Sequence, residues 1–288
     1  MAGKHRNSNA RKLSRRQLLA VAALAPAAGV VGATDVRGSA PAPVVEEAVA
    51  ADTAVPEVIV PVVDRFRGRT PVAWGMDLPG IVHSVPTVPG RRTLALTFDA
   101  CGGGVGVAEE AKLIAVLREF AVPATLFLNS RWITVNPQLM RSIIDDPLFS
   151  VQNHGTRHLP LSASGRPAYG IPGTVSVDDA LAEVTGNRDS VREQFGHEMT
   201  WCRSGTAQYD DVCVDMCNAS GIRIAGFTTN TDHGATASAA QISATIRNMP
   251  DGAIGFGHMN HPGSGTADGV RDAVGQLKNQ GVQFMKMT

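Results

Sequence analysis

The sequence lacks any surplus of positive charge. It has 288 residues with 26 Lys and Arg against 26 Asp and Glu, so the formal net charge at pH 7 is zero. Six of the basic residues lie within residues 1–33, which contain no acid, and the remaining chain therefore carries 20 basic against 26 acidic groups. A protein that binds nucleic acid needs a basic footprint to neutralise phosphates. The charge balance therefore argues against nucleic acid as a partner.

Internal repeats are absent too, and cysteines are few. The four cysteines are Cys101, Cys202, Cys213 and Cys217, and none lies near the apolar segment at the N-terminus, which argues against a lipoprotein. Three complete disulfide pairings are possible, and the sequence does not choose between them. Cys213 and Cys217 are four residues apart, a spacing at which a bridge within one helix is geometrically awkward. Free thiols therefore also fit the pattern.

The first 33 residues have the features of a signal peptide. A basic segment precedes an uncharged run from Leu18 to Ala33, and small residues between positions 27 and 40 offer cleavage sites. The segment Ser14-Arg15-Arg16-Gln17-Leu18-Leu19 resembles a twin-arginine export signal. We therefore expect an exported protein, extracellular or associated with the cell wall. A general secretory signal and an uncleaved membrane anchor are the alternatives.

Two further regions follow. Residues 34–68 are rich in Ala, Pro, Val and acids without a helical or strand period, which predicts a disordered linker. Residues 69–288 alternate between strand-like and helix-like patterns and are expected to form a single catalytic domain. The seven expected strands are residues 93–98, 123–128, 149–152, 199–202, 222–228, 253–257 and 282–287. Such alternation predicts an α/β fold with a parallel sheet, either open or closed into a barrel.

Five polar side chains fall at or just after the ends of five different expected strands. They are Asp99, His154, Arg203, Asp232 and His258. In α/β barrels and open sheets, the carboxyl ends of the strands form the edge at which sites are built. Hydrolysis of an amide or ester can use three such components: a metal, an acid that accepts a proton from water, and a histidine that protonates the leaving group. We therefore expect these side chains to share one site.

His154 and His158 are the candidate metal ligands. They are four residues apart, so on a helical turn they would share one face, and imidazole is a common ligand of zinc and related ions. The pair alone is weak support for a metal site, because surface and packing histidines also occur at this spacing. Its position beside the other strand-end residues strengthens the hypothesis.

These residues resemble the motifs of the polysaccharide deacetylases, carbohydrate esterase family 4, over roughly residues 90–288. The family motif Thr-Phe-Asp-Asp corresponds to Thr97-Phe98-Asp99-Ala100, and His-Ser/Thr-x-x-His corresponds to His154-Gly155-Thr156-Arg157-His158. The remaining three motifs correspond to Arg203-Ser204-Gly205-Thr206, Asn230-Thr231-Asp232 and Gly257-His258. The resemblance implies a distorted (β/α)7 barrel that removes N- or O-acetyl groups from glycans with a divalent metal.

The resemblance also implies roles for the matched residues. Asp99 corresponds to the catalytic base and Arg203 to the residue that steers it. His258 corresponds to the general acid, with Asp232 as its partner. The metal, zinc or cobalt, is expected on His154 and His158, and the backbone N–H near Thr206 is expected to stabilise the oxyanion.

Several other side chains are weaker candidates. His261 and Asn230 could substitute for His258 and Asp232, and His233 is expected to be a loop residue. Three tryptophans could stack on sugar rings, although packing in the core is their default role; they are Trp74, Trp132 and Trp201.

One departure from the family pattern concerns the metal. The second aspartate of the first motif is a metal ligand in the family, and Ala100 stands in its place. Three protein ligands are usual at a catalytic zinc. Asp99 could become a ligand, Cys101 could donate sulfur, or water or substrate could fill the position. Ser204-Gly205 in place of Pro-Pro also loosens the third motif.

The sequence therefore predicts an exported, monomeric, metal-dependent deacetylase whose substrate is an amino-sugar glycan. Contact with a membrane is expected only through the signal or anchor segment. Two alternatives remain open at this stage: a metal-free relative that binds glycan without hydrolysis, and an O-acetyl esterase on the same scaffold.

Overall fold

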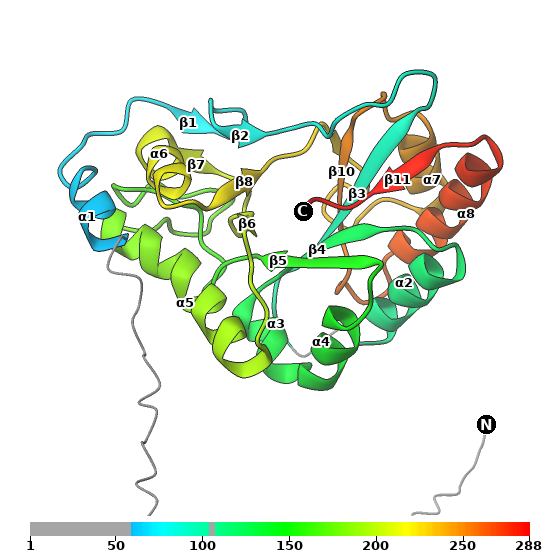
Figure 1. Ribbon diagram of the computed structural model, residues 1–288, viewed down its shortest axis with the longest axis horizontal. Helices are drawn as coiled ribbons and strands as arrows, with labels where there is room; N and C mark the ends of the chain where they lie inside the picture. Colours follow the sequence, from blue (N-terminus) through cyan, green and yellow to red (C-terminus); the bar gives the residue numbers. More distant parts are fainter. Residues whose placement is uncertain (1–58, 104–106) are drawn as a thin grey trace, which may run out of the picture. The chain divides into compact units, whose positions relative to one another are not determined.

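The structure is a computed structural model that describes residues 59–103 and 107–288 (Figure 1). The expected signal peptide and most of the expected linker lie outside these residues. Among the helices described, none combines the length and apolar character needed to span a bilayer. All seven expected strands are present, with ends shifted by a few residues.

One nine-stranded sheet forms the centre of the domain. Its order is β2-β8-β6-β5-β4-β3-β10-β9, with β11 pairing to β3, and all its pairings are parallel. The strands are β2 (Ile81–Val82), β3 (Thr93–Ala100), β4 (Ala124–Leu128), β5 (Phe149–Asn153), β6 (Trp201–Cys202), β8 (Arg223–Ala225), β9 (Thr229–Asn230), β10 (Ile254–His258) and β11 (Gln283–Met285). Two short strands outside this sheet, β1 (Trp74–Gly75) and β7 (Tyr209–Asp210), pair antiparallel.

Residues 223–230 join the two sides of the sheet. Their first part, β8, pairs with β6, and their last part, β9, pairs with β10. Between the two strands, the Thr228 backbone N–H donates to the Ile254 carbonyl at 3.0 Å. The parallel sheet thereby curls on itself, which confirms the expected distorted (β/α)7 barrel.

Helices cover the outside of the curled sheet (Figure 1). They are α1 (Ile59–Asp64), α2 (Val107–Glu119), α3 (Ser130–Val135), α4 (Pro137–Ile144), α5 (Val177–Phe195), α6 (Asp211–Ala219), α7 (Ala239–Arg247) and α8 (Thr266–Asn279). Ser176 and Asp210 are the N-caps of α5 and α6, and their side chains accept from the backbone N–H groups of Asp179 and Cys213, respectively. Asn136 is the N-cap of α4, but its side chain makes no capping hydrogen bond.

Residues 59–68 differ from the expected linker. Residues 59–64 form α1, and Val63 and Phe66 are buried in an apolar cluster with side chains of α5 and α6. The helix was not predicted because Pro61 interrupts the apolar pattern. Proline is nevertheless tolerated in the first turn of a helix, which is where Pro61 lies. The end of the predicted linker therefore belongs to the folded domain.

Alternation along β3 separates the core from the site. Leu94, Leu96, Phe98 and Ala100 face the apolar layer under the outer helices. Successive side chains of a strand point to opposite faces, so Thr97 and Asp99 face the inside of the barrel. All eight residues of β3 are buried, which explains why the sequence reads as a nearly continuous apolar run.

Candidate active site

The five strand-end residues meet at one edge of the barrel, as expected. Asp99 lies near the end of β3, His154 directly after β5, and Arg203 directly after β6. Asp232 follows β9, and His258 is the last residue of β10. Because these strands are parallel, their carboxyl ends bring residues far apart in sequence to the same place.

Asp99 and Arg203 form a buried ion pair. Arg203 Nη1 donates to Asp99 Oδ1 at 2.8 Å, and both side chains are almost completely inaccessible to solvent. Asp99 Oδ2 lies 3.5 Å from His154 Nε2. Burial raises the pKa of Asp99 despite the opposing charge of Arg203. A raised pKa makes the carboxylate a better proton acceptor, as a general base requires.

Arg203 is held on all sides. Its Nη1 also donates to Thr97 Oγ1 at 3.0 Å, and its Nε and Nη2 donate to the carbonyl oxygens of Ala225 and Gly226 at 3.2 and 3.0 Å. The Phe127 ring centroid lies 4.3 Å from the guanidinium carbon, a cation–π geometry. These contacts compensate the buried positive charge of Arg203. They also fix the orientation of its guanidinium group, which in turn orients Asp99.

His258 and Asp232 form a second acid–base pair. Asp232 Oδ1 lies 3.1 Å from His258 Nδ1, and Asp232 Oδ2 accepts from the His258 backbone N–H. Burial opposes protonation of His258, but Asp232 and the neighbouring Cys101 thiol raise its pKa to about 10. His258 is therefore cationic near neutral pH and can donate a proton. Its ring lies 5.4 Å from that of His261, which is exposed and does not line the pocket described below.

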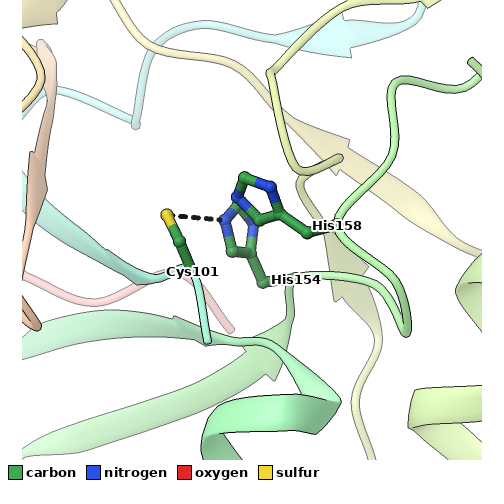
Figure 2. A group of neighbouring side chains, drawn as sticks. All are labelled: Cys101, His154 and His158. Carbon is green, nitrogen blue, oxygen red and sulfur yellow. Dashed lines mark hydrogen bonds between the residues drawn. The ribbon is translucent and has the colours of Figure 1, made fainter. Parts of the chain in front are cut away.

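The candidate metal-binding pair, His154 and His158, lies in a loop, which corrects the expected helical turn. Residues 154–158 follow β5 without helical structure, and both Gly155 and His158 have positive φ angles, 76° and 68°. The rings of His154 and His158 nevertheless lie 4.9 Å apart in an edge-to-face arrangement (Figure 2). Burial lowers the pKa of each histidine to about 3, so both imidazoles are neutral, as metal ligation requires.

Glu183 on α5 shapes this loop. Its buried carboxylate accepts from the backbone N–H groups of Arg157 and Leu159 and from Arg157 Nε. A Cβ on Gly155 would lie 2.6 Å from Glu183 Oε1, so the glycine is required both by its φ angle and by this contact. The sequence offered no sign of this role, because Glu183 lies 25 residues or more beyond the loop on a helix with many charged residues.

The departure in the third motif has a steric reason. A Cβ on Gly205 would lie 2.3 Å from the backbone carbon of His158, so a larger residue there requires a different path of the histidine loop. The neighbouring Ser204 N–H donates to the Tyr209 hydroxyl at 2.8 Å. Gly205 thus permits the observed path of the histidine loop, in which His158 has a left-handed conformation.

Cys101 lies beside the histidine pair (Figure 2). Its Sγ is 3.6 Å from His154 Nε2, and one ligand atom each from Cys101, His154 and His158 lie within 4.8 Å of one another. This set does not include Asp99, which stays paired with Arg203. The donor set fits a divalent ion, because His158 Nε2 is buried and has no hydrogen-bond partner among the described residues. All four cysteines are free thiols.

A pocket of about 580 Å³ lies beside this group, and Cys101 is the member of the group that lines it. Its lining also includes Asp99, His258, Thr206 and Tyr169. Tyr169 is 75% exposed, an aromatic side chain that sequence reasoning missed because it lies in a loop of Gly and Pro. None of the three tryptophans lines this pocket. Trp132 and Trp201 are in the core, as their default role predicted.

Asn230 and His233 are the remaining residues considered in the sequence analysis. Asn230 and His233 both line the pocket and are exposed, and the Asn230 side chain accepts from the His233 backbone N–H. Neither replaces Asp232 as the partner of His258.

Comparison with known proteins places the chain in a family. A family described as polysaccharide deacetylase matches residues 87–248, and the chain belongs to that family. No match was found among curated proteins.

Several solved structures share the fold. A CE4 family pseudoenzyme from Bacillus anthracis is 19% identical with a TM-score of 0.60, over 73% of this chain and 68% of that chain. Peptidoglycan deacetylase PdaC from Bacillus subtilis is 19% identical with a TM-score of 0.56, over 69% of this chain and 90% of that chain. PdaA from Bacillus subtilis, a family 4 carbohydrate esterase, is 16% identical with a TM-score of 0.59, over 79% and 86%.

Proposed function

We propose that the protein is an exported, metal-dependent deacetylase that hydrolyses N-acetyl groups of an amino-sugar glycan such as peptidoglycan or a chitin-like polymer. One observation carries the proposal: a buried base paired with arginine and a cationic histidine line one pocket, and Cys101, which lines the same pocket, lies beside a neutral histidine pair. Export rests on the signal-like residues 1–33.

The metal belongs to this proposal. A divalent ion, zinc or cobalt, held by His154 and His158, would supply Lewis-acid activation of water and of the acetyl carbonyl. The residues around it contribute the proton transfers. Asp99, held by Arg203, accepts the proton of the attacking water. The backbone N–H at Thr206, at the pocket wall, donates to the developing oxyanion.

We infer from the environment of His258 that the site favours an amide over an ester. An amine is a poor leaving group unless it is protonated as it departs, whereas an alcohol leaves more easily. The pKa of His258, raised to about 10, keeps its proton available for this step. This favours N-acetyl over O-acetyl groups, and a comparison of matched N- and O-acetylated substrates tests it.

The main experiment measures acetate release. Wild-type protein, His154→Ala and Asp99→Asn are assayed on N-acetylglucosamine oligomers and peptidoglycan, with and without added Zn²⁺ or Co²⁺. Metal-dependent release in the wild type and its loss in both variants are expected. Full activity without metal, unaffected by His154→Ala, would refute the mechanism.

A second candidate is a relative that binds glycan without hydrolysing it. Ala100 favours it, because the carboxylate that the family pattern places there is missing. A neighbour in fold is a CE4 family pseudoenzyme, and a mutant of it is described as having restored enzymatic activity. Glycan binding without acetate release, and without bound metal, would support this candidate. The complete set of Asp99, Arg203 and His258 counts against it, since binding alone needs no acid–base pair.

A further inference from the structure

We propose that Cys101 is the third protein ligand of the metal, so that a thiolate takes the place of the carboxylate missing at Ala100. The inference rests on the metal dependence of the proposed function. Its support comes from the register of β3, the distances between donor atoms, and the partners that hold each donor.

The register of β3 explains why the donor has moved by one residue. Ala100 packs in the outer apolar layer with Leu96 and Phe98. Thr97 and Asp99 alternate onto the inner face, where both contact Arg203. The next residue that this alternation places on the inner face is Cys101. Its Sγ lies 3.6 Å from His154 Nε2, and the residue lines the pocket. Position 101 therefore presents its side chain to the histidine pair, whereas position 100 does not.

The distance between donors fits a tetrahedral site. With zinc–sulfur and zinc–nitrogen bonds of about 2.3 and 2.05 Å and a tetrahedral angle, the sulfur and nitrogen atoms lie about 3.6 Å apart. Cys101 Sγ and His154 Nε2 are 3.6 Å apart. This pair of donors needs little rearrangement to bind an ion, and the ligand atoms of Cys101, His154 and His158 all lie within 4.8 Å of one another. Three protein ligands leave the fourth position for water or substrate, as in other catalytic zinc sites.

The two histidines present free lone pairs. His154 Nδ1 lies 2.9 Å from the Arg203 carbonyl, which can only accept, so Nδ1 carries the hydrogen and Nε2 is available to a metal. His158 Nε2 is buried without a hydrogen-bond partner among the residues described. A buried, unpaired nitrogen is costly unless something ligates it.

The backbone around Cys101 is fixed from two sides. Asn260 Oδ1 accepts from the Cys101 N–H at 3.3 Å, and Arg131 Nη2 donates to the Cys101 carbonyl at 2.8 Å. Gly102, with a φ of 107°, turns the chain away directly afterwards. The thiol is thus positioned before any ion binds.

Sulfur ligation has two chemical consequences. A soft thiolate with two imidazoles favours zinc over magnesium, manganese or calcium, which prefer oxygen donors. It also leaves Asp99 free of the metal, so the carboxylate keeps its hydrogen bond to Arg203 and its role as base.

Cobalt absorption spectroscopy tests the proposal directly. Metal-free protein is titrated with Co²⁺, and a sulfur-to-cobalt charge-transfer band in the near ultraviolet is expected to saturate at one equivalent. Cys101→Ser and Cys101→Asp should lack the band, although the aspartate variant should still bind cobalt. Cys213→Ala, which removes a buried thiol of α6 remote from the site, should keep it. Zinc affinity of Cys101→Ser should fall by more than about 100-fold, because loss of even an outer partner of a ligand costs 10- to 100-fold.

The outcomes separate this proposal from the function. One equivalent of cobalt bound without the band, or a band that persists in Cys101→Ser, would overturn sulfur ligation and leave metal-dependent hydrolysis intact. Absence of cobalt binding would overturn both. X-ray absorption at the zinc edge of the wild-type protein needs no variant, and one sulfur at about 2.3 Å is expected there; a shell of nitrogen and oxygen alone would contradict the proposal.

Discussion

Arg203 Nη1 donates to Asp99 Oδ1 at 2.8 Å inside the barrel, and neither side chain has appreciable contact with solvent. Removing one partner of such a pair strands the other as an uncompensated buried charge. The pair therefore links stability to catalysis, and substitutions can separate the two contributions.

We predict that Arg203→Met lowers the free energy of unfolding by about 3–5 kcal/mol, because Asp99 loses its cationic partner. The double variant Asp99→Asn/Arg203→Met should recover most of that loss, since it removes the unpaired charge. Denaturant unfolding of the single and double variants measures both effects. Equal stability of the two variants would show that Asp99 imposes no burial cost.

The His258–Asp232 pair should make stability depend on pH in the alkaline range. The folded-state pKa of His258 is about 10, against about 6.5 for an unfolded histidine. A raised pKa contributes stability that is fully present below the unfolded value and is lost as the pH rises through the folded value. We therefore expect the wild-type free energy of unfolding to fall between about pH 6.5 and pH 10.

Asp232→Asn tests whether the Asp232 carboxylate is what raises the pKa of His258. Without the carboxylate, the pKa of His258 should drop and this part of the pH dependence should shrink. A histidine titration followed by NMR reads the pKa directly, and His261→Gln serves as the control for a neighbouring exposed ring. An unchanged His258 titration in Asp232→Asn would contradict the pairing.

Gly205→Ala should weaken metal binding while leaving the rest of the domain folded. The added Cβ would lie 2.3 Å from the His158 backbone carbon and would displace the loop that carries this ligand. We expect at least a tenfold loss of zinc affinity, in the range seen when ligand orientation is disturbed. Isothermal titration calorimetry measures it. Gly275→Ala in α8, where the nearest neighbour is a phenylalanine ring at 3.3 Å, is the matched control and should keep wild-type affinity.

Tyr169 should contribute to glycan binding and not to chemistry. It is 75% exposed at the pocket and offers a flat face on which a sugar ring can stack. Tyr169→Ala should raise KM several-fold on oligomers with little change in kcat, whereas Tyr169→Phe should behave like the wild type. A fall in kcat without a change in KM would place the tyrosine in the reaction itself.

Much of this architecture was predictable because local pattern and tertiary structure agree. Apolar runs followed by a polar residue marked the strand ends, and the parallel sheet brought Asp99, Arg203 and His258 together. The conformation of the histidine loop was not predictable, because it depends on Glu183 of α5 and on the close approach of Gly205. Both contacts join segments more than 20 residues apart and leave no periodic signal.

The position of Cys101 was partly accessible from the sequence. Alternation of side chains along the strand from Thr97 through Asp99 places position 101 on the inner face. The expected strand ended at residue 98, however, so the sequence pattern did not assign Cys101 to either face. The helix at residues 59–64 was missed because proline near a helix start interrupts the pattern without preventing the helix.

The segment that closes the barrel also supplies two acceptors to the guanidinium of Arg203. Ala225 and Gly226, which bind the Arg203 guanidinium, belong to residues 223–230, and this segment joins β6 to β10. Without this segment in place, the Arg203 guanidinium would lack these two acceptors. The orientation of the Asp99 carboxylate therefore depends, through Arg203, on the segment that joins the two sides of the sheet.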